Sequence, residues 1–120
     1  NKVKLPFEPS WPAQVAAIAA LDDTAYIQNT IASCREGMKN MEMVFKEMEL
    51  DYIPSAANFL TLVFNNEEEA GSFSDSILHK GIILRHLAGW GLPDCVRITI
   101  GQESENEYLI FCLSEILSEA

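Results

Sequence analysis

The stretch Gly81–Gly101, GIILRHLAGWGLPDCVRITIG, decides the fold. Three bulky apolar residues, Ile82–Leu84, indicate a short strand that ends at Arg85. A turn rich in glycine and proline follows, and Cys95–Ile100 then alternates between more and less apolar residues. These features predict a hairpin of two short strands, around which the rest of the chain is built.

The alternation places an arginine on the less apolar face of the second strand. Val96, Ile98 and Ile100 share one face, so the Arg97 side chain lies on the other. A guanidinium group in mid-strand has to pair with an acid or face a cleft, because burial without a partner is costly. Since Arg85 ends the first strand, we expect both arginines to approach one cleft. The spacing leaves a purely structural salt bridge open for each.

Two helices are expected ahead of this region. Ser10 and Pro12 are typical of a helix start, and Ala13–Leu21 continues a short alanine-rich helix. A longer helix is predicted across Thr24–Glu49, because apolar residues recur there in steps of four and three. This stripe fits a coiled coil or, because strand patterns follow, a helix that faces the core of a mixed domain. Its members are Ile27, Ile31, Cys34, Met38, Met41, Phe45 and Met48.

Strands and helices are also predicted on both sides of the hairpin. Asp51–Ile53 indicates a short edge strand, and Asn58–Phe64 is apolar on both faces, as a covered central strand should be. Asn66 is a candidate cap for a helix with an acidic first turn. Ser104 and Glu107 are spaced as a capping box at the start of a last helix.

This order of elements predicts an α/β protein of the two-layer α+β type. A small, mostly antiparallel sheet would be covered on one face by helices. The other face, which holds Arg97, would be exposed to solvent or covered by another domain. We expect residues 1–23 to form an inter-domain segment with a short helix, and residues 24–120 to form the domain itself.

Composition and motifs exclude several classes of function. The 120 residues suffice for one modest core, and 18 acidic against 8 basic residues, net −10, argue against nucleic acid or an anionic membrane as partner. No apolar run could span a bilayer and no signal peptide is visible, so a cytoplasmic protein is expected. The three cysteines are expected to be buried free thiols. No metal-ligand spacing and no nucleophile motif is present, so we expect no metal site and no catalytic residue.

The stretch Gly81–Gly101 resembles the carboxyl-terminal signature of the fold-type I, pyridoxal-phosphate-dependent aminotransferases. It looks most like the histidinol-phosphate aminotransferase subfamily, with its glycine–hydrophobic–arginine strand, G-x-P turn and (L/V)RI(S/T)IG strand. The pair Asn106–Glu107 fits the same pattern. Residues 54–59, PSAANF, resemble the family's P-S-x-A-N-F segment, and residues 10–21 resemble the helix after the cofactor-lysine segment. Where the family has PFN or PYN, this chain has Pro6–Pro9, PFEP.

The resemblance implies the small carboxyl-terminal domain of a homodimeric enzyme of histidine biosynthesis. That enzyme would transfer an amino group between L-histidinol phosphate and 2-oxoglutarate. Pyridoxal phosphate would be bound by a large domain with the Schiff-base lysine, since none of this chain's five lysines has that context. The chain alone would therefore be inactive. Arg97 would hold the substrate carboxylate and Arg85 its distal phosphate, unless Arg85 pairs with Asp94 or a nearby glutamate.

Other functions remain open at this point. Within the superfamily, the pattern also fits an aromatic amino-acid aminotransferase or a threonine-phosphate decarboxylase. Outside it, the predicted fold suits a stand-alone ligand-binding or regulatory module, such as an amino-acid sensor.

Overall fold

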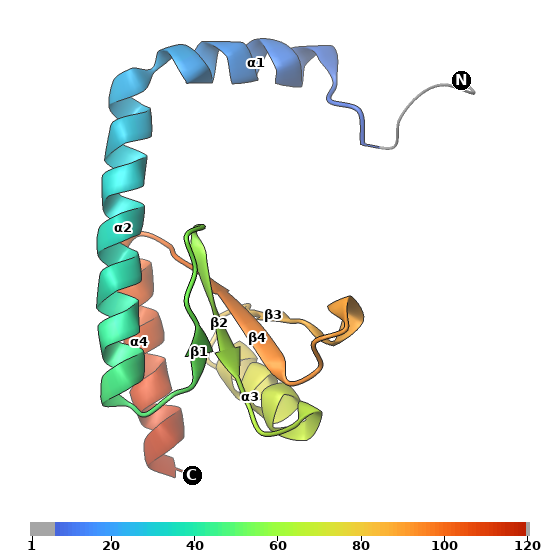
Figure 1. Ribbon diagram of the computed structural model, residues 1–120, viewed down its shortest axis with the longest axis vertical. Coiled ribbons are helices and arrows are strands. Elements are labelled where there is room, and N and C mark those ends of the chain that lie inside the picture. The colour runs from blue at the N-terminus through green and yellow to red at the C-terminus, as the bar shows by residue number, and fades with distance from the viewer. Residues whose placement is uncertain (1–6, 120) are drawn as a thin grey trace, which may run out of the picture. The chain divides into compact units, whose positions relative to one another are not determined.

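The structure, a computed structural model, describes residues 7–119 (Figure 1). The chain divides after Ala32 into two compact units. In the described residues the elements follow in this order: α1 (Trp11–Asp22), α2 (Thr24–Glu47), β1 (Tyr52–Ile53), β2 (Phe59–Val63), α3 (Glu67–His79), β3 (Arg85–His86), the 3-10 helix η1 (Ala88–Trp90), β4 (Cys95–Thr99) and α4 (Glu103–Glu119).

The first unit holds α1 and the start of α2, and both helices begin as the sequence predicts. The Ser10 hydroxyl accepts a hydrogen bond from the Ala13 N–H at 3.4 Å, and proline stands in the first turn. Asp23 accepts one from the Tyr26 N–H at 3.0 Å. The predicted Ser10 cap is therefore confirmed, and Asp23 caps the start of α2.

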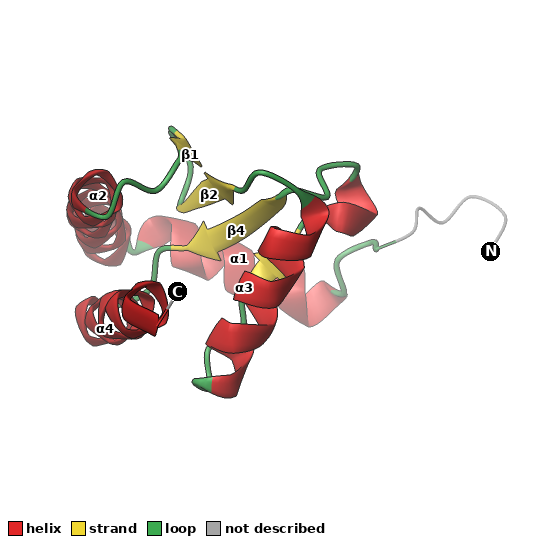
Figure 2. Cartoon of the chain, turned by 90° about the horizontal axis from the view of Figure 1, so that it is seen from below, coloured by secondary structure: helices red, strands yellow, loops and turns green. Residues whose placement is uncertain are grey.

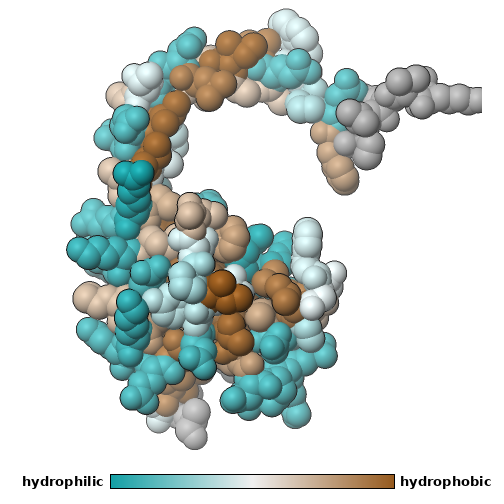
Figure 3. All heavy atoms as spheres, in the orientation of Figure 1, coloured by the Kyte–Doolittle hydropathy of each residue, from teal (hydrophilic) through white to brown (hydrophobic). Residues whose placement is uncertain are grey.

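The α1 helix has no buried residue. Trp11 is 76% exposed and Ile18 65% exposed, and apolar atoms run along the helix in Figure 3. A helix that is apolar on all sides is typical of one enclosed by other elements.

The second unit is built on a four-stranded antiparallel sheet with strand order β1-β2-β4-β3. Helices α3 and α4 lie on the same side of this sheet, with α2 beside α4 (Figure 2). The predicted two-layer fold, with an antiparallel sheet covered on one face by helices, is confirmed.

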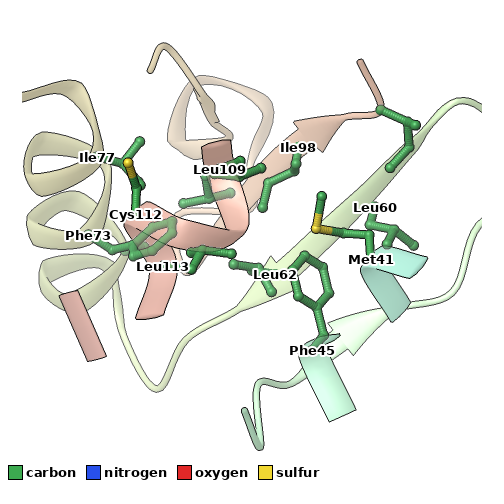
Figure 4. Close-up of a cluster of buried hydrophobic side chains, with 13 residues drawn as sticks. Met41, Phe45, Leu60, Leu62, Phe73, Ile77, Ile98, Leu109, Cys112 and Leu113 are labelled. Atoms are coloured by element: carbon green, nitrogen blue, oxygen red, sulfur yellow. The ribbon is translucent and has the colours of Figure 1, made fainter. Parts of the chain in front are cut away.

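One hydrophobic core joins the sheet to the three helices (Figure 4). It includes alternate residues of the two central strands, as the period of two requires. The apolar stripe of α2 faces this core at Met41 and Phe45, whereas Ile31 is 38% exposed. The core-facing interpretation of that stripe is thus confirmed for its second half. The core residues are Met41, Phe45, Leu60, Leu62, Ala70, Phe73, Ile77, Val96, Ile98, Ile100, Leu109, Cys112 and Leu113.

The predicted strand Ile82–Leu84 is wrong. Gly81 has φ +85°, which turns the chain out of α3, and the Ile82 N–H donates to the Ile77 carbonyl at 3.2 Å. This bond ties the segment to the end of α3, and Ile82 and Leu84 pack against the core. Pairing with β4 is confined to Arg85 and His86, which form β3.

Three smaller expectations also need correction. The long helix ends at Glu47 rather than Glu49, because Glu49 takes a left-handed conformation with φ +56°. The last helix is capped by Glu105, which accepts from the Gln102 N–H at 2.7 Å, and not by the Ser104–Glu107 pair. Cys95 and Cys112 are buried free thiols, but Cys34 is only partly buried.

Among the helices of residues 7–119, none has the length and apolar character that a membrane span requires.

Candidate functional site

A cavity of about 290 Å³ lies at the end of the sheet where the pairing of β3 with β4 stops. Since the ladder reaches only as far as Arg85, the segment before it leaves β4 and a gap opens between them. The cavity therefore has three walls: the edge of β4, the segment that precedes β3, and the start of α4. The lining residues are Ile82, Ile83, Leu84, Arg85, Arg97, Thr99, Gly101, Glu105, Asn106 and Leu109.

The two arginines predicted as site residues both line this cavity. Arg85 and Arg97 are register partners across β3 and β4, and Thr61 of β2 is the partner of Arg97 on its other side. Register partners lie on the same face of a sheet, and this face is the one opposite the core residues of β4. Two like charges placed opposite each other repel, so an anion between them would lower the energy of the pair.

Arg97 is held in place by packing, and one of its polar atoms lacks a partner. Its guanidinium carbon lies 5.4 Å from the centroid of the Phe59 ring, within range of a cation–π contact. Its Nε is buried and has no hydrogen-bond partner in the described residues. An unsatisfied buried donor costs about 1–3 kcal/mol. A bound anion that accepts this hydrogen bond would remove that cost.

Neither arginine forms an ion pair within residues 7–119. Asp94, the acid considered as a partner for Arg85, instead accepts a hydrogen bond from the Cys95 thiol at 3.4 Å. The structural salt bridge left open by the sequence is thus not formed among the described residues. The two guanidinium groups remain available to a ligand, and a guanidinium binds carboxylate or phosphate in two-pronged fashion.

The start of α4 closes one end of the cavity through two residues that sequence reasoning did not assign to the site. Asn106 accepts a hydrogen bond from the Gly101 N–H at 2.9 Å and donates one to the Gly101 carbonyl at 3.1 Å. Glu105 accepts from the Gln102 N–H. A signal existed in the sequence, because a glycine after a strand is followed five residues later by an asparagine near a helix start.

The wall formed by the segment before β3 is anchored to α4 as well. The Tyr108 hydroxyl donates to the Lys80 carbonyl at 2.9 Å, and the Lys80 ammonium pairs with Glu115 at 2.9 Å. These contacts fix the end of α3, from which the segment Ile82–Leu84 leaves. The wall that leads to Arg85 is therefore attached to the same helix that carries Asn106.

The turn between β3 and β4 connects the two strands that carry Arg85 and Arg97. It contains η1 and Gly91, whose φ of +80° explains why glycine stands there. A ring nitrogen of His86 lies 2.6 Å from the Pro93 carbonyl and bridges the two ends of the turn. The turn thereby keeps Arg85 in register with Arg97.

The cavity is lined by two guanidinium groups, which bind anions, and by no lysine. Lysine is absent from the lining of the cavity, and Lys80 has its own acidic partner. Lys2 and Lys4 lie outside the described residues. The part of the chain described here thus provides guanidinium groups but no amine at the site.

Comparisons with known proteins identify the family of this chain. The family profile for aminotransferase class I and II matches residues 1–112. Histidinol-phosphate aminotransferase of Akkermansia muciniphila is 38% identical over 117 residues, which are 98% of this chain and 31% of that protein. Histidinol-phosphate aminotransferase 2 of Pasteurella multocida is 39% identical, over 98% of this chain and 32% of that protein. The chain spans about a third of the length of these curated relatives.

Solved structures show the same fold. Histidinol-phosphate aminotransferase from Sinorhizobium meliloti, in complex with pyridoxal-5'-phosphate, has a TM-score of 0.77 and 26% identity, over 87% of this chain and 29% of that one. The enzyme of the same name from Clostridium acetobutylicum has a TM-score of 0.78 and 24% identity, over 90% of this chain and 33% of that one, and supports the fold alone. The profile match over nearly the whole chain shows the family. This chain belongs to the class I and II aminotransferases.

Proposed function

We propose that this chain is the small domain of a pyridoxal-phosphate-dependent aminotransferase of the histidinol-phosphate type, and that its cavity binds the anionic group of the substrate. The observation on which this rests is the arginine pair. Arg85 and Arg97 line one cavity without an acidic partner in the described residues, and the buried Nε of Arg97 lacks an acceptor. The similarity to histidinol-phosphate aminotransferases supplies the substrate class.

The chemistry of the two substrates explains why two arginines are useful. L-histidinol phosphate bears a phosphate ester on the carbon that is a carboxylate carbon in an amino acid. One guanidinium can therefore meet the carboxylate of 2-oxoglutarate in one half-reaction and the phosphate in the other. We assign this contact to Arg97. A phosphate carries more charge and more acceptor oxygens than a carboxylate, so a second contact from Arg85 would favour the phosphorylated substrate.

The cofactor and the rest of the enzyme belong to the same proposal. Pyridoxal phosphate acts as the electron sink for amino transfer. The described residues offer it no lysine at the cavity, so we place its binding in a large domain of the full-length protein. Residues 1–23 would then be the inter-domain segment, and the exposed apolar surface of α1 would be covered by that large domain. The full-length enzyme would be a homodimer. The role of residues 24–120 is to position the substrate.

The test is amino transfer by the full-length protein. With L-histidinol phosphate and 2-oxoglutarate, glutamate should form, and Arg97→Ala should reduce its formation strongly. Glutamate formed faster from an aromatic amino acid would favour the aromatic aminotransferase. Release of carbon dioxide from threonine phosphate, without glutamate, would favour the decarboxylase. Full activity of Arg97→Ala would contradict the proposed role of the cavity.

The comparisons favour an aminotransferase over the stand-alone binding module. The relatives reported above are aminotransferases and match almost the whole chain. We therefore propose no second function.

A further inference from the structure

Asn106 takes the place of a neighbouring strand at the end of β4. The Ile100 N–H donates to the Asn58 carbonyl at 2.9 Å, on the side of β2. Backbone groups of successive residues in a strand point to opposite edges. The N–H and C=O of Gly101 therefore point to the edge on which β3 pairs, beyond the point where that pairing has stopped. Both groups bond the Asn106 side chain there.

The hydrogen bonds between Asn106 and Gly101 also shape the cavity. Gly101 and Asn106 both line it, as does Arg97, four residues before Gly101 on the same strand. The two hydrogen bonds therefore join the wall formed by α4 to the strand that carries Arg97. If they were lost, the start of α4 could move away from β4, whereas Arg97 would keep its pairing with β2 and β3.

Gly37 confines Asn106 from the opposite side. It is buried on α2, and a Cβ at this position would lie 2.9 Å from Asn106 Nδ2 and 2.7 Å from Ile100 Cγ2. Both distances are shorter than any ordinary contact, so α2 can pack against the Asn106 amide only because position 37 has no side chain. Glycine inside a helix costs about 1 kcal/mol relative to alanine, and this close packing gives a reason for it.

We propose that Asn106 is a positioning residue for the anion-binding cavity, and that Gly37 allows α2 to pack against its amide. This inference rests on the function proposed above. Asn106 fixes the distance between the α4 wall and the two arginines, and so the fit of the substrate anion between them. The anion is bound in the same way in the enzyme–substrate complex and in the transition state. Loss of this fit should therefore raise KM more than it lowers kcat.

The experiment compares two asparagine variants in the full-length enzyme. Asn66 is a matched control, because it also stands at a helix start and makes two side-chain hydrogen bonds, both to Glu69, but does not line the cavity. Asn106→Ala should raise KM for L-histidinol phosphate at least about fivefold with kcat within about twofold, and Asn66→Ala should leave KM unchanged. Equal KM changes in both variants would overturn the proposal. So would failure of Asn106→Ala alone to fold, since Asn106 would then be scaffold.

A pair of glycine variants tests the same proposal without removing a hydrogen-bonding group. Gly37→Ala crowds Asn106, whereas the Cβ of Gly71→Ala on α3 would meet no atom within 4 Å. Gly37→Ala should repeat the rise in KM and Gly71→Ala should not, and identical KM values would overturn the role of Gly37. Arg97→Ala separates this inference from the proposed function. If Arg97→Ala leaves KM unchanged, the function itself fails; if only Arg97→Ala raises KM, the inference about Asn106 fails alone.

Discussion

Arg85 and Arg97 stand directly opposite each other on β3 and β4, so two guanidinium groups share one face of the sheet and one cavity. Cross-strand neighbours of like charge destabilise a sheet by up to about 1 kcal/mol relative to neutral pairs. The arrangement is therefore unfavourable for folding alone and becomes favourable when an anion lies between the two groups. We therefore propose that the pair acts as one anion-binding site.

The first prediction concerns the share of Arg85 in this site. Arg85→Ala in the full-length enzyme should reduce kcat/KM for L-histidinol phosphate more than for an amino acid with a carboxylate, because phosphate offers more acceptors to a second guanidinium. Arg35→Ala is the control, since Arg35 is exposed on α2 and does not line the cavity. An equal loss towards both substrates would show that Arg85 is a scaffold residue.

The second prediction concerns the core. Phe45 of α2 is fully buried and its ring meets that of Tyr52 edge-on, with 5.6 Å between centroids. Phe45→Ala should lower the free energy of unfolding of the chain by about 3–5 kcal/mol. Met43, on the same helix, is 54% exposed, and Met43→Ala should lower it by less than about 1 kcal/mol. Urea unfolding measures both. Similar losses would mean that the two faces of α2 are wrongly assigned.

The third prediction concerns the cysteines. Burial raises the pKa of the Cys95 thiol, which is 3% exposed, and the neighbouring Asp94 carboxylate raises it further. Cys34 is only partly buried, so iodoacetamide should modify Cys34 well before Cys95 in this chain. Mass spectrometry of the labelled peptides gives the order, and prior labelling of Cys95 would contradict the packing of β4.

The raised pKa of Cys95 also predicts a pH dependence of stability. The folded state holds the thiol proton to a higher pH than the unfolded state, whose thiol ionises at its ordinary value of 9.0. The contribution to the free energy of unfolding is thus complete below pH 9.0 and is lost as the pH rises through the folded-state value. Cys95→Ala should make urea unfolding less dependent on pH between neutral pH and about 10. If the free energy of unfolding of Cys95→Ala changes with pH as steeply as that of the unmodified chain, the pH dependence does not come from Cys95.

Features fixed by neighbouring residues could be predicted from the sequence. The alternation in Cys95–Ile100 placed Arg97 on the face opposite the buried Val96 and Ile98, and Asn66 capped α3 as expected, with its side chain bonded to the Glu69 N–H. Both depend on side chains within a few residues of one another. The resemblance to aminotransferases also rested on such short motifs, and the family match supports it.

Features fixed by contacts between distant elements could not be predicted. The apolar run Ile82–Leu84 has a strand-like composition, yet its hydrogen bond to Ile77 and its packing on the core keep it out of the sheet. The role of Gly37 was hidden for the same reason, because Asn106 lies far along the chain. The cavity exists only because the ladder between β3 and β4 ends early, and no local pattern records where a ladder ends.

The central claim is that the guanidinium of Arg97 binds the anionic group of the substrate, and Arg97→Lys tests it most directly. Lysine keeps the charge but lacks the planar fork. In the full-length enzyme, the change should weaken transition-state binding by about 1.5–3 kcal/mol, so kcat/KM for L-histidinol phosphate should fall about 10- to 150-fold. Arg35→Lys is the control and should leave kcat/KM unchanged. A value of kcat/KM for Arg97→Lys equal to that of the unmodified enzyme would contradict the claim.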